Sequence, residues 1–145
     1  MESAQGSALK ILLDTNVVSQ TVKLQPNPAV ARWWEEQEES SLMLSAITFQ
    51  ELRFGIALLP DGKKREQLQQ WLEVRLQREF AGKVLAITHE IADMSGRLLA
   101  AARKASHTAD PADTLIAATA LVHRLQIATL NRKHFEKLGA DLISF

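Results

Sequence analysis

Cysteine is absent from the sequence, which excludes disulfide bonds and thiolate metal sites. A net charge is absent as well, because 17 Lys and Arg residues balance 17 Asp and Glu residues. Most proteins that bind nucleic acid have a basic balance, so binding of a nucleic acid here would depend on local basic patches or bound cations. The glycines form neither G-x-G-x-x-G nor G-x-x-x-x-G-K, and a dinucleotide site or a P-loop is therefore unsupported.

Long apolar runs are also missing. Met1–Ala8 is small and polar, unlike a signal peptide, and the longest apolar-rich run, Leu115–Val122, is too short to span a bilayer. We therefore expect a cytoplasmic protein without membrane association. The 145 residues fit one domain, and 46% hydrophobic residues suffice for a core without cross-links. No linker or repeat is visible, so we expect a flexible N-terminal extension at residues 1–8 and a single domain at residues 9–145.

Short apolar segments alternate with longer amphipathic stretches along the chain. The short segments predict strands at Leu9–Leu13, Leu42–Leu44, Val84–Ile87 and Ile127–Thr129, and a short fifth strand at Asp141–Ile143. Helices are predicted to start at Asn27-Pro28, to span Thr48–Leu59 and Lys63–Phe80, and to follow Thr88 and Asp110-Pro111. Strands separated by helices are typical of an α/β fold with helices on both faces of a parallel sheet. We expect a three-layer α/β/α domain with a mostly parallel central sheet of about five strands.

Acidic residues recur where the predicted strands end or the neighbouring helices begin. Asp14 directly follows the first strand, Glu51 lies in the first turn of the helix after the second strand, and Asp113 lies in the first turn of the helix before the fourth. Right-handed crossovers bring the strand-to-helix turns to one edge of a parallel sheet, so we expect these carboxylates to converge there, near Asn131. Converging carboxylates repel one another, and all-oxygen ligands favour Mg²⁺, or Mn²⁺ in its place, as the compensating charge. A bound cation can activate water and stabilise charge on a phosphoryl oxygen, so the cluster predicts hydrolysis of a phosphodiester.

A purely structural interpretation of the same acids stays open. Thr48 and Glu51 match a capping box, in which Glu51 binds the backbone N–H of Thr48. Asp110 suits a helix N-cap, Asp113 suits the first turn of that helix, and Asp14 could cap the turn after it. Taken one at a time, capping is the commoner role for Glu51 and Asp113. It leaves unexplained why all these positions map to one edge of the sheet.

Four sequence segments occur in a characteristic order and spacing. They are LLDTNVVS (12–19), LSAITFQELRFGI (44–56), PADTLIAATAL (111–121) and IATLNRKHFEKLGADLISF (127–145). Each segment alone is a weak signal, but together, from about Leu9 to the C-terminus, they resemble the PIN-domain family, specifically the VapC and FitB type of bacterial toxin. The resemblance implies a metal-dependent endoribonuclease in which Asp14, Glu51 and Asp113 hold Mg²⁺ or Mn²⁺ and activate the attacking water.

The resemblance also implies supporting residues and partners. Asn16 and Thr129 stand at positions that usually support the metal site through hydrogen bonds. Asn131 stands where some members have an acid and brings no charge as a further ligand, and Leu130 stands where arginine is frequent. The partners implied are an RNA substrate, with transfer RNA as one candidate, a small cognate antitoxin, and a second copy of the chain in a homodimer.

Other polar residues support less specific predictions. Arg53 could contact RNA, an antitoxin or the dimer partner, or only solvent. Two basic stretches on amphipathic helices are either solvated faces or phosphate contacts. The first contains Lys63, Lys64, Arg65, Arg75 and Arg78, and the second contains Arg97, Arg103, Lys104 and His107. The four histidines show no ligand pair at helical spacing, and only the turn that holds His134 is expected near the site.

Two other functions fit the same sequence. Asp14 could form a phospho-aspartate, although phosphatase-like folds normally need a second Asp two residues on, where this chain has Asn16. Alternatively, the domain binds a partner without catalysis and its acids are helix caps. Cleavage of RNA that depends on Asp14, a trapped phospho-aspartate, and saturable binding of Mn²⁺ separate the three hypotheses.

Overall fold

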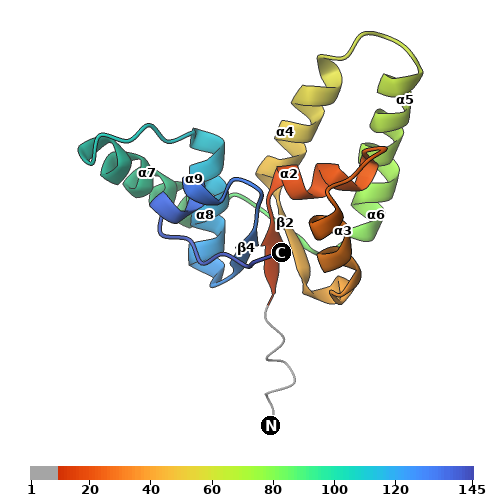
Figure 1. Cartoon of the computed structure of the whole chain (residues 1–145). Helices are drawn as coiled ribbons and strands as arrows, with labels where there is room; N and C mark the ends of the chain where they lie inside the picture. Colours follow the sequence, from red (N-terminus) through yellow and green to blue (C-terminus); the bar gives the residue numbers. More distant parts are fainter. Residues whose placement is uncertain (1–9) are drawn as a thin grey trace.

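A parallel sheet forms the centre of the computed structural model, which describes residues 10–145 (Figure 1). Its four strands are β1 (Ile11–Leu13), β2 (Leu42–Ser45), β3 (Val84–Leu85) and β4 (Gln126–Ala128), in the order β3-β2-β1-β4. Leu12 of β1 pairs with Met43 of β2 and with Ile127 of β4, so β1 has a neighbour on each side. The prediction of a parallel α/β sheet is confirmed. The extension predicted at residues 1–8 lies outside the described residues, as does Leu9.

The expected fifth strand is reduced to an isolated parallel bridge between Ile127 and Leu142. The Ile127 N–H donates to the Asp141 carbonyl at 2.8 Å, and the Ile143 N–H donates to the Ile127 carbonyl at 3.1 Å. These two bonds extend the sheet past β4 by one contact, which is too short for a strand. The third strand is also shorter than the predicted Val84–Ile87.

Helices cover both faces of the sheet because alternate strand residues point to opposite sides. Leu13 packs into one core with Trp33 and Leu72, whereas Leu12 packs into a second core with Phe135. All residues of β1 and β2 are buried, which explains why their sequences are continuous apolar runs and do not alternate.

The helices fall into two groups on the two sides of the sheet (Figure 1). One group contains α2 (Thr15–Val18), η1 (Ser19–Val22), α3 (Pro28–Glu35), η2 (Glu39–Ser41), α4 (Ala46–Ala57), α5 (Lys63–Gln70), the π-helical η3 (Trp71–Leu76) and α6 (Gln77–Glu79). The other contains α7 (His89–Lys104), α8 (Pro111–His123) and α9 (Arg132–Lys137). Within residues 10–145, no helix combines the length and the apolar character needed to cross a membrane.

Helix starts follow local side-chain hydrogen bonds, with one departure from prediction. Asn27, Thr88 and Asp110 cap their helices as predicted, because each side chain accepts a backbone N–H from the first turn. The N-cap of α4 is Ser45, whose hydroxyl accepts a backbone N–H two residues on at 3.2 Å. Thr48 therefore lies inside the helix, and the predicted capping box that begins there is wrong.

Candidate active site

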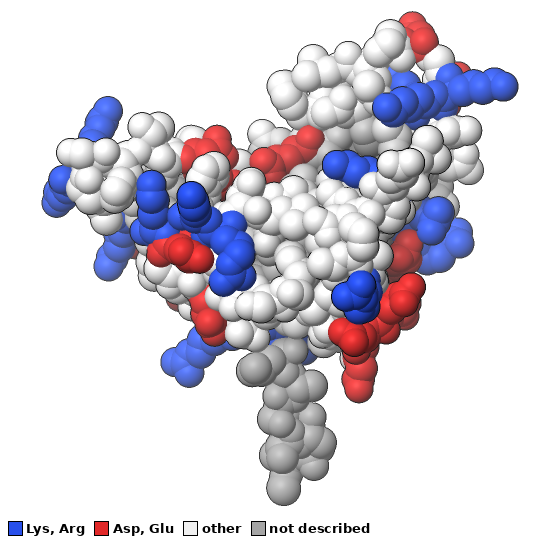
Figure 2. Space-filling view, in the orientation of Figure 1, with Lys and Arg blue, Asp and Glu red and all other residues white. Residues whose placement is uncertain are grey.

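Acidic side chains border the hollow between α4 and the α7–α9 side of the molecule (Figure 2). Asp14 follows β1, Glu51 lies in α4, and Asp113 lies in the first turn of α8. The charges of Glu51 and Asp113 both raise the pKa of Asp14, so the three groups lie within electrostatic reach of one another. The structure thus brings the three predicted acids to the carboxyl edge of the sheet.

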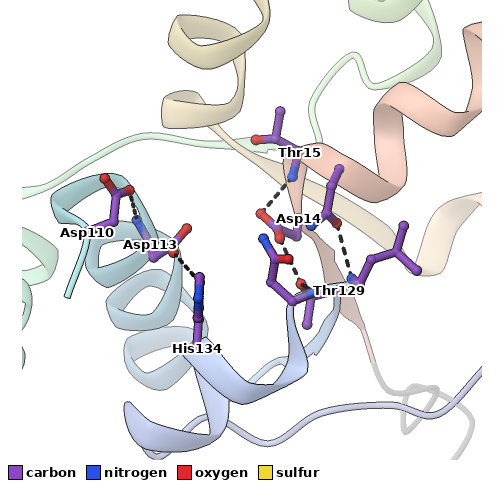
Figure 3. A network of polar contacts seen from close by, with 9 residues as sticks. Asp14, Thr15, Asp110, Asp113, Thr129 and His134 are labelled. Carbon is purple, nitrogen blue, oxygen red and sulfur yellow. Dashed lines mark hydrogen bonds and ion pairs between the residues drawn. The ribbon is translucent and has the colours of Figure 1, made fainter. Parts of the chain in front are cut away.

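Asp14 is the most buried of the three, with 3% of its surface exposed. Its Oδ1 accepts the Thr15 N–H and its Oδ2 accepts the Thr129 hydroxyl, both at 2.8 Å (Figure 3). Its own N–H donates to the Ala128 carbonyl at 2.9 Å, which ties the residue to β4. Asp14 does cap α2, as the structural interpretation expected, but one of its oxygens is held by a residue 115 positions away. Capping alone therefore does not account for its surroundings.

The loop after β4 is held beside Asp14 by three residues that the resemblance selected. The Thr129 hydroxyl, which donates to Asp14, also accepts the Asn131 N–H at 2.9 Å. The Asn16 Oδ1 accepts the Leu130 N–H at 3.2 Å. Asn131 enters this network through its backbone, and its exposed amide makes no capping bond to α9.

Glu51 is joined to the end of β1 by a side chain that the sequence did not single out. The Thr15 hydroxyl donates to Glu51 Oε1 at 2.6 Å and also lies 3.2 Å from the Thr48 hydroxyl. Glu51 is therefore directed at the edge of the sheet and not at its own helix terminus. Thr15 links the two acids, because its N–H binds Asp14 while its hydroxyl binds Glu51.

Asp113 combines a local role with an open carboxyl group. Its N–H donates to Asp110 Oδ2 at 3.1 Å, which confirms Asp110 as the N-cap of α8. Figure 3 shows the Asp113 carboxyl group on the side of α8 that faces Asp14, with His134 beside it. The His134 Nδ1 lies 3.4 Å from Asp113 Oδ2. His134, expected only to be near the site, thus contacts one of its acids.

Burial is the largest influence on the pKa of Asp14 and raises it to about 6. Hydrogen bonds from Thr129 and Thr15 oppose this increase, because they favour the ionised form. The negative charges of Asp113 and Glu51 add to it. Near neutral pH, an ionised Asp14 is therefore destabilised unless positive charge lies close to it.

The pKa values of the other two acids are raised in the same way. Burial raises the pKa of Glu51, a hydrogen bond from Thr15 opposes the increase, and the charges of Asp113 and Asp110 add to it. Burial also raises the pKa of Asp113, Asp110 adds to the increase, and His134 lowers the value. Four acids thus crowd one edge of the sheet and oppose one another's ionisation.

A divalent cation fits the chemistry of this edge, although the acids are not preassembled around one. Within residues 10–145, no three His, Cys, Asp or Glu side chains form a ready-made cluster for a metal ion. A small hard cation tolerates such an arrangement, since Mg²⁺ usually keeps several water ligands and binds through one or two carboxylates. The donors are all oxygens, and the raised pKa values mark negative charge that a cation would neutralise.

Arg53 forms an ion pair with Glu73, which is not one of the acids described above. Its guanidinium lies 2.7 Å from a Glu73 carboxylate oxygen, and both side chains are about half exposed. The ion pair joins α4 to η3 on the surface.

Comparison with known proteins gives a consistent result. The PIN domain profile matches residues 11–141. VapC ribonuclease Y4jK from Sinorhizobium fredii is 40% identical over 134 residues, which cover 92% of this chain and 96% of that protein. Toxin FitB from Neisseria gonorrhoeae is 38% identical over 135 residues, or 93% of this chain and 96% of that protein. The crystal structure of FitAcB from Neisseria gonorrhoeae superimposes with a TM-score of 0.85 at 36% identity and covers 92% of this chain and 96% of its own.

Proposed function

Because the chain belongs to the PIN-domain family, we propose that it is a ribonuclease that hydrolyses RNA phosphodiester bonds and acts as the toxin of a toxin–antitoxin pair. The relatives named as a VapC ribonuclease and as toxin FitB support both parts of the proposal. The likeness spans nearly the whole of this chain and of each relative, so the proposal concerns the same domain in all three.

The observation that carries the proposal is Asp14, whose burial raises its pKa to about 6, with a smaller contribution from the charges of Asp113 and Glu51. We propose that these three acids bind Mg²⁺, for which Mn²⁺ can substitute. When bound, the cation lowers the pKa of a water molecule and stabilises charge on a phosphoryl oxygen.

The chain's own side chains would keep the acids ionised and oriented. Thr129 and the Thr15 N–H fix both oxygens of Asp14, and the Thr15 hydroxyl fixes Glu51. Asn16 holds the loop after β4 against the start of α2. Hydrogen bonds that orient the ligands of a metal ion typically change metal affinity or activity by about 10- to 100-fold.

We propose a cytoplasmic location and three partners. The partners are an RNA substrate, with transfer RNA as one candidate, a small cognate antitoxin, and a second copy of this chain. Arg53 is proposed as a contact to RNA or to the antitoxin, because breaking its surface pair with Glu73 costs little in water.

Incubation of the purified protein with labelled RNA tests the nuclease proposal. We expect cleavage with Mg²⁺ or Mn²⁺, no cleavage with EDTA, and no cleavage by Asp14→Asn. The matched control is Asp61→Asn, because Asp61 is an exposed acid before α5 whose removal changes the charge equally. Equal degradation of RNA by the wild type and Asp14→Asn would mean that the activity is a contaminant or the site is wrong.

A binding domain without catalysis is the second candidate, since the described residues hold no ready-made metal cluster. Calorimetric titration with Mn²⁺ separates the two. A saturable site that Asp14→Asn loses and Asp61→Asn keeps supports the nuclease, and absence of any such site favours the binding domain. Phosphoryl transfer through Asp14 would leave a phospho-aspartate that can be trapped, and its absence beside stable RNA products dismisses that alternative.

A further inference from the structure

A groove adjoins the Asp113 side of the candidate active site. It begins as a cavity of about 460 Å³ lined by Asp113, His134, Lys137 and the loop between α7 and α8. A neighbouring cavity of about 670 Å³ shares residues 107–109 of that loop and adds Arg103. The shared residues make the two cavities neighbours along the loop, and together they are here called the α7–α9 groove, which extends from Asp113 to the end of α7.

Two cations on the rim of the α7–α9 groove are available to an anion. Arg103 lies in the last turn of α7 and Lys137 ends α9, and both are exposed. Among residues 10–145, neither has an acidic partner, whereas Arg97 and Arg132 on the same helices are ion-paired within their own helix. Figure 2 shows Lys and Arg side chains gathered on this side of the molecule, next to the acidic hollow.

The loop that forms one wall of the groove is fixed by its own hydrogen bonds. Ser106 takes a left-handed conformation with φ 60°, and the His107 N–H donates to the Ala102 carbonyl at 2.8 Å, which closes the end of α7. The chain then reaches Asp110, which caps α8. A wall of fixed shape loses little conformational entropy when a ligand binds.

We propose that the α7–α9 groove binds the phosphate backbone of the RNA strand next to the bond that is cut, with Arg103 and Lys137 each contacting a phosphate. This inference rests on the proposed function, because it takes Asp113 to lie at the scissile phosphate. An RNA strand whose scissile phosphate lies at Asp113 must continue from there across the neighbouring protein surface. The α7–α9 groove begins at Asp113 and carries unpaired cations, so it suits this part of the strand. The exposed rings of His107 and His134 add hydrogen-bonding groups beside the track. Asp110 caps α8 and keeps a negative charge beside the track, so Arg103 and Lys137 would bind phosphates against this opposing charge.

The test compares two double variants that remove the same charge. Arg103→Gln/Lys137→Gln changes the groove, and Lys63→Gln/Lys64→Gln removes two exposed lysines at the start of α5, in the other helix group. Binding of labelled single-stranded RNA is measured in EDTA, and kcat and KM are measured with Mg²⁺. For the groove variant we expect Kd and KM to rise about tenfold, kcat to stay within about twofold, and the salt slope of binding to fall by about 1.4, since each phosphate contact on a single strand contributes about 0.7. The control should match the wild type.

Two further measurements make the inference specific. A dinucleotide contains only the phosphate that is cut and no neighbouring phosphate for the groove, so the groove variant should cleave it as the wild type does. Arg103→Lys/Lys137→Arg keeps both charges and should restore binding of the longer RNA. The single variant Lys137→Gln, with a melting curve, guards against an effect of misfolding.

The outcomes separate this inference from the proposed function. Equal losses in the groove and control variants, or no loss in either, overturn the groove as a phosphate track. Displacement of RNA by poly-glutamate as readily as by poly-uridine also overturns it and assigns the groove to an acidic peptide. RNA binding that depends on the groove, in a protein that never cleaves RNA, supports the groove and refutes the nuclease.

Discussion

Asp14 lies at the end of a central strand with 3% of its surface exposed, whereas Asp113 lies in the first turn of α8 with 16% of its side chain exposed. Both oxygens of Asp14 accept hydrogen bonds of 2.8 Å, one of them from the neighbouring strand end. The carboxyl group of Asp113 lies 3.4 Å from the exposed His134 and accepts no side-chain hydrogen bond as short as those of Asp14 from residues 10–145. One acid is therefore fixed by tertiary structure, and the other can adjust its rotamer.

This difference suggests a division of roles within one proposed metal site. A fixed, desolvated carboxylate sets the position of a cation, because its oxygens cannot follow the ion. An adjustable carboxylate beside an open groove can complete the coordination when substrate arrives. The difference also explains why the charges of Asp113 and Glu51 act on Asp14 although, within residues 10–145, the three carboxyl groups are not grouped closely enough to form a ready-made metal site.

The largest expected effect is the loss of activity in Asp14→Asn, by more than about 100-fold, since even indirect support of a metal ligand can be worth that much. Asp113→Asn should lose activity as well, but higher Mg²⁺ should recover part of it, because the position of the cation is set elsewhere. Initial rates against Mg²⁺ concentration measure both. If high Mg²⁺ restored the activity of the two variants equally, Asp14 and Asp113 would not differ as a fixed and an adjustable ligand.

A second effect concerns the stability of the metal-free protein. The pKa of Asp14 rises from its ordinary 3.8 to about 6 on folding, so the folded state favours the protonated acid. That contribution is fully present below pH 3.8 and is lost as the pH rises through about 6, at a cost of up to about 3 kcal/mol. Asp14→Asn should therefore stabilise the metal-free protein at pH 7 by about 2 kcal/mol, because the Thr129 hydroxyl can turn to accept the new amide N–H.

Urea unfolding in EDTA at pH 7 and at pH 4 measures this effect. The difference between the wild type and Asp14→Asn should shrink to a small fraction at pH 4, where the folded protein holds Asp14 protonated and the unfolded chain is only partly ionised. A destabilised variant at pH 7 would show that the burial of Asp14 is not its main constraint.

Third in size is the response to Thr129→Val, which removes the hydroxyl that links Asp14 to the neighbouring strand end. Burial already raises the pKa of Asp14, and loss of this bond should raise it further and leave the Asn131 N–H without its partner. We expect about a tenfold loss of activity at pH 7 and an acidic limb of the pH profile that moves to higher pH. Thr129→Ser keeps the hydroxyl and should retain the wild-type profile; a parallel shift in both variants would point to packing instead.

The sequence was sufficient to predict where Asp14 lies in the fold. Asp14 directly follows an apolar run, and topological rules place the end of such a run at the carboxyl edge of the sheet. Thr129 came only from the resemblance, because its bond to Asp14 spans 115 positions and leaves no local pattern. Thr15 was missed for a similar reason, since its partner Glu51 is 36 positions away.

The errors in the predicted elements also have physical causes. Thr48 imitates an N-cap, but Ser45 is an equally good capping residue at the end of β2, so α4 starts earlier. Leu68, Leu72, Leu76 and Phe80 recur at a strict spacing of four, which drifts by about 40° per step around an ideal α-helix. The π-helical η3 lies within this repeat, and it keeps Leu72 and Leu76 on the buried side.

The smallest expected effect is that of Asp110→Asn, which changes the surroundings of the adjustable Asp113. Asn is as good an N-cap as Asp, so α8 should keep its start, while a negative charge beside the groove is removed. Burial is the main cause of the raised pKa of Asp113, and the charge of Asp110 comes next, so the acidic limb of the pH profile should move to slightly lower pH.

We also expect KM for RNA to fall about twofold, because a repulsive charge at an exposed site is worth only a few tenths of a kcal/mol in salt. Asp93→Asn, which removes an exposed acid paired with Arg97 on α7, is the matched control and should leave both quantities unchanged. If Asp110→Asn lowers activity as strongly as Asp113→Asn, then Asp110 is more than a helix cap and acts at the site together with Asp113. The adjustable side of the site would then consist of two acids of α8 and its cap, opposite the fixed Asp14.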